Sequence, residues 1–239
     1  MTDMPNDVIP EGYVPPEIPR LSFAQIIKTL DIAVLKPDAR LEDVTIAARF
    51  VEDAGAASVC VASCNVALAK TITPRVCSVV GFPHGTTRDF IKYAEARAAI
   101  EDGAVEVDVV INYGHFLEGR KVAVTQELGQ IVQLAHKANA KVKAILETCY
   151  YHPRQIIAAC ELCVDVGVDW VKTSTGFGPS GATPWAVQLM VETVKDAAGV
   201  KASGGIKTYE DACLYLALGC TRLGVGATSY KGLLPSTPS

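Results

Sequence analysis

The stretch AVEVDVVIN, residues 104–112, gives the clearest indication of the fold. Every odd-numbered position from 105 to 111 is Val or Ile, whereas Glu106, Asp108 and Asn112 stand at even-numbered positions. Because successive side chains of a β-strand point to opposite faces, one face of this strand is apolar and the other carries acids. We expect the apolar face to pack against helices and the acidic face to point into a closed sheet.

Short β-rich runs of this kind alternate with amphipathic helical stretches along the whole chain. Eight strands are expected, at residues 31–35, 57–62, 75–81, 104–112, 141–147, 168–173, 200–204 and 220–226. Helical windows lie between them at residues 42–54, 65–71, 87–102, 122–139, 153–166, 184–198 and 209–218. Thr183 followed by Pro184 is a typical helix start, and glycines just past the last turn, such as Gly55 and Gly167, are typical stops.

Eight strands with a helical stretch between each one and the next predict an α/β fold of the single (β/α)₈ TIM barrel type. A doubly wound open sheet would have fewer strands and a glycine-rich turn after the first one, but the segment DIAVLKPDA, residues 31–39, contains no glycine. Residues 1–20 hold five Pro and four acids, which predicts an extended or mobile N-terminal arm. We therefore expect the barrel to be one catalytic domain over residues 21–232, followed by a tail at 233–239.

Composition excludes several classes of protein. The chain has 239 residues, 49% of them hydrophobic, and its 22 basic and 26 acidic side chains give a net charge of −4. This balance argues against nucleic acid or an anionic membrane as the main partner. No apolar run approaches the roughly 18 residues of a membrane span, and the first 20 residues do not resemble a signal peptide. We expect a cytoplasmic protein.

The eight cysteines are too sparse for a disulfide scaffold. Cys160 and Cys163 form one C-x-x-C pair, but it lies inside a helical pattern and has no second pair beside it, whereas structural zinc needs four ligands. We expect buried free thiols and no metal. Cys60 points inward on the second strand, where a packing role is favoured over reactivity toward aldehydes.

Charged side chains fall where a barrel interior should be apolar. The alternation in KVKAILE, residues 141–147, directs Lys143 inward, as it does Asp108 on the preceding strand. Lys172 and Lys201 stand near the ends of the sixth and seventh strands. Buried strand charges are retained when they are paired or used, so two alternatives arise: a structural ion-pair network, or an active site at the carboxyl ends of the strands.

The converging lysines suggest a specific chemistry. A second ammonium about 5 Å from Lys172 would repel it by roughly 3 kcal/mol at an effective dielectric constant of ~20, and burial acts in the same direction. Both effects favour the free amine, which is the form that attacks a carbonyl to make a Schiff base. Lys201 is the candidate second cation, and Asp108 is the candidate proton carrier between the two lysines. No metal is required for this reaction.

Two glycine-rich segments follow the last two strands. Ser203-Gly204-Gly205 is associated with the seventh, and Gly224-Val225-Gly226-Ala227-Thr228-Ser229 with the eighth. Loops at these two positions of a barrel often bind a phosphate group. Ordinary glycine turns are the alternative. A third segment, residues 175–181, directly follows Lys172 and could close over a substrate.

These residues carry a family resemblance. EVDVVIN around Asp108, VKTSTGFGPSGATP around Lys172 and VKASGGIKT around Lys201 resemble the three motifs of the deoxyribose-phosphate aldolases, in the same order and spacing. VGFPHG (80–85), KAILET (143–148) and ASVCVAS (57–63) are also similar to segments of that family. The resemblance extends over roughly residues 23–232.

The resemblance implies a class I aldolase, free of metal and cofactor, that cleaves 2-deoxy-D-ribose 5-phosphate reversibly to D-glyceraldehyde 3-phosphate and acetaldehyde. Its ligands would be these small molecules, and it would act in carbohydrate and deoxyribonucleotide degradation as a homo-oligomer, a dimer or larger. Lys172 would form the Schiff base, with Lys201 and Asp108 as the other catalytic residues. The resemblance places three further residues in supporting or substrate-contacting positions: Lys143, Asp31 and Thr175. It places five glycines at the phosphate: Gly176, Gly204, Gly205, Gly224 and Gly226.

Three positions depart from the family pattern. The first strand usually carries a hydroxyl two residues after its Asp, where this chain has Ala33, and many members carry serines where this chain has Gly226 and Ala227. The alternative function is therefore a related Schiff-base aldolase with a different aldehyde or sugar-phosphate preference. A non-catalytic sugar-phosphate sensor on the same fold is the alternative from another class, and the intact lysine pair opposes it.

Overall fold

The computed structural model describes residues 13–233, so most of the expected arm and nearly all of the tail lie outside the described residues. Residues 13–20 run without helix or strand, and Tyr13 packs against the main hydrophobic core. Leu21 continues the chain into the barrel, where its backbone N–H donates to the hydroxyl of Tyr209 and its carbonyl accepts from the same hydroxyl. The beginning of the described chain is thus tied to the last helix of the barrel.

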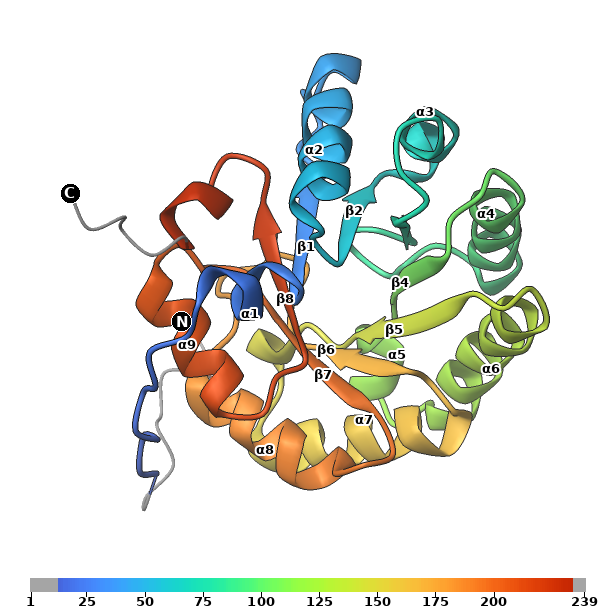
Figure 1. Cartoon of the computed structure of the whole chain (residues 1–239). Coiled ribbons are helices and arrows are strands. Elements are labelled where there is room, and N and C mark those ends of the chain that lie inside the picture. Colours follow the sequence, from blue (N-terminus) through green and yellow to red (C-terminus); the bar gives the residue numbers. More distant parts are fainter. Residues whose placement is uncertain (1–12, 234–239) are drawn as a thin grey trace.

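Eight parallel strands form a closed barrel in sequence order, with β1 paired to β8 (Figure 1). The strands are β1 Leu30–Val34, β2 Ser58–Val61, β3 Val76–Val80, β4 Glu106–Val110, β5 Lys141–Ile145, β6 Trp170–Lys172, β7 Gly199–Ser203 and β8 Arg222–Gly226. All eight lie within the expected strand ranges except for the first residues of β1 and β7, which start one position earlier. The TIM barrel prediction is confirmed.

Helices surround the strands, as Figure 1 shows. They are α1 Phe23–Ile27, α2 Leu41–Ala54, α3 Val66–Lys70, α4 Asp89–Glu101, α5 Tyr113–Leu117, α6 Lys121–Lys137, α7 Pro153–Val166, α8 Pro184–Val194 and α9 Tyr209–Ala217. Short 3₁₀ turns are η1 Ser63–Asn65, η2 Thr148–Tyr150 and η3 Tyr230–Leu233. The expected start at Pro184 and the stops at Gly55 and Gly167 are present, the two glycines in left-handed conformations.

The structure differs from the sequence-based expectation at three helices. The five-residue helices α1 and α5 were not expected, since a segment of little more than one turn shows almost no helical periodicity; α3 is equally short but lies within the expected window 65–71. Helix α8 ends at Val194 rather than at residue 198, because Lys195 adopts a positive φ of 48° and turns the chain toward β7.

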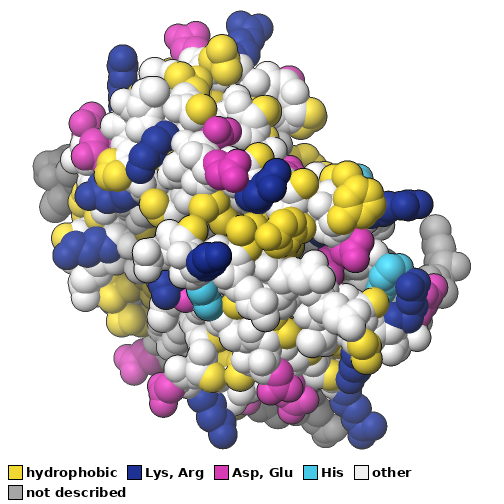
Figure 2. Space-filling model, turned by 90° about the vertical axis from the view of Figure 1, so that its right-hand side faces the viewer, with side chains coloured by type: hydrophobic (Ala, Val, Ile, Leu, Met, Phe, Trp, Pro, Cys, Tyr) yellow, Lys and Arg dark blue, Asp and Glu magenta, His cyan; other side chains and the backbone are white. Residues whose placement is uncertain are grey.

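The hydrophobic core fills the layer between strands and helices, and the barrel interior is divided. One part of the interior is a small apolar cluster of Cys60, Cys77 and Val79 from β2 and β3. The remainder is lined by charged residues of β1 and of β4 to β8. On the outer surface in Figure 2, basic and acidic side chains are interspersed, and hydrophobic side chains gather in a band across the middle of the face.

Candidate active site

The centre of the barrel interior is the carboxylate of Asp108 on β4, which three lysines contact. Lys143 Nζ lies 2.8 Å from its Oδ1, while Lys172 Nζ and Lys201 Nζ lie 2.7 and 2.8 Å from its Oδ2. Asp108 and Lys143 have no exposed surface, and Lys172 and Lys201 are 3% and 1% exposed. The structure therefore brings together four of the predicted site residues in a buried cluster.

Strand register produces this convergence. Asp108 is paired with Lys143 between β4 and β5, and Lys172 is paired with Lys201 between β6 and β7. Because paired residues of neighbouring parallel strands point to the same face, each pair enters the barrel together.

Beneath the lysines lies a second layer of charges that includes Arg222 on β8. Its guanidinium donates to Asp31 Oδ1 and to Glu106 Oε1, each at 2.7 Å, and it packs over the Trp170 ring at 4.9 Å. Lys143 also donates to Glu106, and Lys201 also donates to Asp31. This connected network comprises four cationic side chains (Lys143, Lys172, Lys201, Arg222) and three anionic ones (Asp31, Glu106, Asp108), so one cation is in excess.

The network holds most of its members in their charged forms. Burial alone would raise the pKa of Asp108, but the ammonium groups of the three lysines hold it well below its usual range. Burial would likewise lower the pKa of Lys201 and Lys143, yet Asp108 and the other acids raise both above the usual lysine value. The pKa of Asp31 is lowered against burial, chiefly by Lys201.

A cavity of about 540 Å³ opens above this network at the carboxyl ends of the strands. Lys172 and Lys201 lie on its wall, as do Ala33 and Cys60 on the β1–β2 side. The five glycines predicted to bind phosphate all line it: Gly176, Gly204, Gly205, Gly224 and Gly226. Lys172 is thus the member of the network that combines access to the cavity with a single anionic partner, Asp108.

Of the three residues predicted to support or contact the substrate, two lie below the cavity and one lines it. Asp31 is fully buried and its oxygens accept from Ser58, Lys201 and Arg222, so it supports the network from below rather than lining the cavity. Lys143 is also buried beneath the cavity. Thr175 does line the cavity, but its hydroxyl donates to the carboxylate of Glu147.

Sequence reasoning missed the part played by Arg222. The eighth strand reads RLGVG, in which two glycines hide the alternation that identified inward-pointing residues on β4 and β5. That this partly buried Arg, at the first position of β8, lies next to the inward-pointing Glu106 becomes visible only once the barrel closes.

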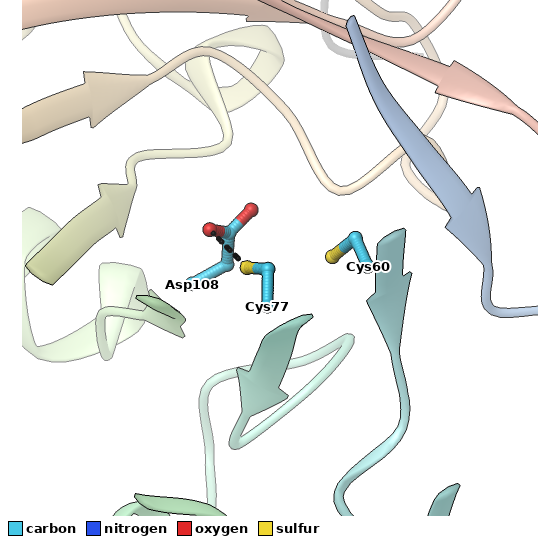
Figure 3. A group of neighbouring side chains, drawn as sticks. All are labelled: Cys60, Cys77 and Asp108. Atoms are coloured by element: carbon cyan, nitrogen blue, oxygen red, sulfur yellow. Dashed lines mark hydrogen bonds between the residues drawn. The ribbon is translucent and has the colours of Figure 1, made fainter. Parts of the chain in front are cut away.

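Figure 3 shows the group of potential metal ligands in this region, Cys60, Cys77 and Asp108. Their ligand atoms lie within 4.8 Å of one another, and Cys77 Sγ donates to Asp108 Oδ1 at 3.1 Å. However, both oxygens of Asp108 already accept from ammonium groups, and Lys143 also donates to Cys77 Sγ at 3.3 Å. Burial raises the pKa of Cys77 well above its usual value. A protonated thiol and three adjacent ammonium groups make this donor set a poor fit for a divalent cation.

Within residues 13–233, none of the helices has both the length and the apolar composition needed to traverse a bilayer.

Comparison with known proteins gives consistent matches over most of the chain. A deoxyribose-phosphate aldolase of Thermococcus gammatolerans is 43% identical over 208 residues, covering 84% of this chain and 92% of that protein. One of Caldanaerobacter subterraneus subsp. tengcongensis is 42% identical over 211 residues, covering 86% and 91%.

Solved structures agree with these relatives. The tetrameric deoxyribose phosphate aldolase from Aeropyrum pernix superposes with a TM-score of 0.81 at 33% identity, covering 89% of this chain and 91% of that one. The aldolase QR15 gives a TM-score of 0.81 at 36% identity, covering 85% and 92%. Mandelate oxidase, at 13% identity and a TM-score of 0.60, shares the fold alone.

Residues 25–219 match the family described as DeoC/LacD family aldolase. This match covers most of the barrel and includes the strands that carry Asp108, Lys172 and Lys201. The chain belongs to the DeoC/LacD aldolase family.

Proposed function

We propose that this protein is a class I aldolase that cleaves 2-deoxy-D-ribose 5-phosphate reversibly to D-glyceraldehyde 3-phosphate and acetaldehyde, with Lys172 as the Schiff-base residue. The observation that carries the proposal is the position of Lys172 on the cavity wall, with its Nζ 2.7 Å from an Asp108 oxygen that Lys201 also contacts. Names of relatives that are about 40% identical support the same substrate.

The reaction begins when the free amine of Lys172 attacks C1 of the open-chain sugar. The resulting carbinolamine takes up a proton and loses water to give a protonated imine, which accepts the electron pair in the next step. Removal of the C3 hydroxyl proton then breaks the C2–C3 bond, which releases D-glyceraldehyde 3-phosphate and leaves an enamine on Lys172. Protonation of the enamine at C2 and hydrolysis of the imine release acetaldehyde and regenerate the amine.

Asp108 and Lys201 are assigned the proton transfers. Asp108 is an anion whose Oδ2 lies within hydrogen-bond distance of Lys172 Nζ and of Lys201 Nζ. Asp108 can therefore accept a proton from Lys172, and Lys201 stands beside it as the next proton donor. Because its pKa is raised, Lys201 remains a cation and can donate to a hydroxyl or a developing alkoxide in the cavity.

The glycines at the ends of β7 and β8 are assigned to the phosphate group. Gly204 and Gly205 both have a φ of +84°, and a side chain at Gly224 would approach Ser203 Cβ to 2.8 Å. Backbone with these conformations and without side chains leaves room for amide groups to approach an anion closely.

A homo-oligomer and a cytoplasmic location belong to the same proposal. The solved relative from Aeropyrum pernix is described as tetrameric, which supports an oligomer without specifying its size for this chain. Residues 21–232 are proposed as the catalytic unit.

Borohydride trapping tests the assignment. Incubation with acetaldehyde and sodium borohydride followed by peptide mass spectrometry is expected to place a reduced adduct on Lys172, and Lys172→Leu is expected to abolish it. Lys201→Leu should lower the trapping rate by about 10²–10⁴-fold while the chain stays folded. An undiminished adduct in Lys172→Leu would assign the nucleophile to another residue.

One observation favours the alternative of a related aldolase with another sugar-phosphate preference. Ala33 lines the cavity and offers no hydroxyl to a substrate, and Asp31 beside it is buried below. Retro-aldol rates measured over a panel of sugar phosphates separate the two functions. A kcat/KM for another sugar equal to or higher than that for 2-deoxy-D-ribose 5-phosphate would replace the proposed substrate.

A further inference from the structure

Glu147 occupies an unusual position immediately after β5. Its backbone is left-handed, with φ 57° and ψ 61°, and its side chain is only 2% exposed. A non-glycine residue in this conformation is uncommon and persists where the surrounding structure holds it in place.

The carboxylate of Glu147 faces the segment that follows Lys172. Oε2 accepts a hydrogen bond from the Thr175 hydroxyl, and Oε1 accepts from the Thr175 backbone N–H at 3.2 Å. Cys149 Sγ approaches Oε1 at 3.9 Å. On the other side, a Cβ at Gly178 would lie 3.2 Å from Glu147 Cδ and Oε1, so the loop packs directly on the carboxylate.

Thr175 connects Glu147 to the wall of the cavity. Its hydroxyl oxygen accepts from the Phe177 backbone N–H at 3.0 Å, which orders the turn that contains Gly176. Thr175, Gly176 and Phe177 all line the cavity, and Gly176 packs against Gly204 at the end of β7. The chain of hydrogen bonds Glu147–Thr175–Phe177 therefore fixes the backbone of one wall of the cavity.

We propose that Glu147 is a positioning residue that holds the loop 175–178 in the shape that binds the phosphate end of the substrate. This inference rests on the proposed function. It assigns the Thr175 hydroxyl to the loop itself rather than to the substrate. Burial raises the pKa of Glu147, as expected for a carboxylate enclosed by the loop.

Two substitutions separate the carboxylate from the backbone conformation. Glu147→Gln keeps the shape, but its side chain has one acceptor oxygen for two Thr175 donors, and its amide N–H₂ would face one of them. Glu147→Gly removes the carboxylate and adopts positive φ freely, so it keeps the chain direction. Thr175→Val removes the hydroxyl at nearly constant volume, whereas Thr175→Ser retains it.

The measurement is steady-state kinetics with 2-deoxy-D-ribose 5-phosphate and with unphosphorylated 2-deoxy-D-ribose, together with borohydride trapping by acetaldehyde. Glu147→Gln, Glu147→Gly and Thr175→Val are expected to raise KM for the phosphorylated sugar about tenfold, the size of effect of one lost hydrogen bond to a charged group. Thr175→Ser is expected to restore KM. The unphosphorylated sugar and the trapping rate should change less than about twofold.

Glu127→Gln is the matched control, because Glu127 is also a buried acid but contacts Lys92 in the outer layer. It should leave the ratio of the two KM values unchanged. An equal loss for both sugars, or a parallel loss of trapping, would show that Glu147 acts on Lys172 instead and would overturn the inference. Absence of trapping in the unsubstituted protein would instead refute the proposed function.

Discussion

Two regions of this barrel bury salt bridges, and their charges behave in opposite ways. In the interior network, the pKa of Asp108 is lowered and that of Lys201 is raised, so burial does not neutralise them. In the outer layer, Lys92 on α4 donates to Glu127 on α6 at 2.7 Å, yet burial lowers the pKa of Lys92 and raises that of Glu127. The outer pair is thus held closer to neutrality than the inner network.

The number of counter-ions explains the difference. Lys92 donates directly to one acid, Glu127, and to the carbonyl of Val110, and its aliphatic chain packs on Gly81, where a Cβ would approach it to 2.7 Å. Asp108 has three ammonium groups around it. In a single buried pair, the attraction between the two charges barely compensates for the hydration that both lose. Where several opposite charges converge on one group, their summed attraction compensates for that loss. We infer that the outer pair serves packing and that the inner network, with its excess cation beside the cavity, serves chemistry.

The strongest test of this comparison is Asp108→Asn. The substitution keeps the shape but removes the shared anion, so proton transfer fails, Lys172 loses its single anionic partner, and Lys143 and Lys201 each lose one of their acidic partners. We expect kcat/KM to fall by about 10³-fold or more and the free energy of unfolding to fall by about 3–5 kcal/mol. Kinetics and denaturant unfolding measure the two effects, and near-normal turnover would remove Asp108 from the mechanism.

The second test changes the charge balance from below the cavity. Arg222→Gln leaves three cations and three anions, so the network should hold its protons more tightly and the acid limb of the pH–rate profile should move to higher pH. Glu106→Gln leaves four cations and two anions, so the limb should move to lower pH. A unit charge ~10 Å from a titrating group, at an effective dielectric constant of ~20, changes the free energy of protonation of that group by about 1.7 kcal/mol. This corresponds to a shift of the acid limb by about one pH unit.

The double variant of Arg222 and Glu106 serves as the control for this test. It restores the excess of one cation, so its acid limb should return toward that of the unsubstituted protein. Shifts of the two single variants in the same direction would mean that geometry, and not charge, dominates the effect of these residues.

Much of the inner region could be predicted from local sequence pattern, and the outer pair could not. Strict alternation on β4 and β5 identified Asp108 and Lys143 as inward-pointing, because period two is a property of any strand. The glycines of β8 interrupt the alternation that would have identified Arg222 as an inward-pointing residue. The hydrogen bonds between Glu147 and Thr175 depend on how two loops meet. Lys92 and Glu127 lie 35 residues apart on different helices, so only the packing of those helices reveals the pair.

The third test replaces the outer pair by apolar side chains. Lys92→Met or Glu127→Leu alone leaves one buried charge without a partner and is expected to lower the free energy of unfolding by about 3 kcal/mol. The double variant should be nearly as stable as the unsubstituted protein, and kcat/KM should stay within about twofold in all three. A large loss of activity in a folded double variant would contradict the division between the two regions.

The smallest effect is expected at Asp169, a partly buried acid outside the barrel interior whose basic partners Lys141 and His136 are exposed. Burial would raise its pKa, but hydrogen bonds from Lys141, the Val142 backbone and His136 lower it overall. The unfolded chain therefore binds the proton more readily, so the stabilisation is complete above pH ~4 and is lost as the pH falls toward the lower folded-state value. Since Lys141 is half exposed, we expect Asp169→Asn to cost about 1 kcal/mol or less near neutral pH, and to remove that part of the decline in stability below pH ~4. Unfolding curves between pH 3 and 7 measure this, and an unchanged acid dependence in Asp169→Asn would place the acid-sensitive carboxylates elsewhere in the barrel.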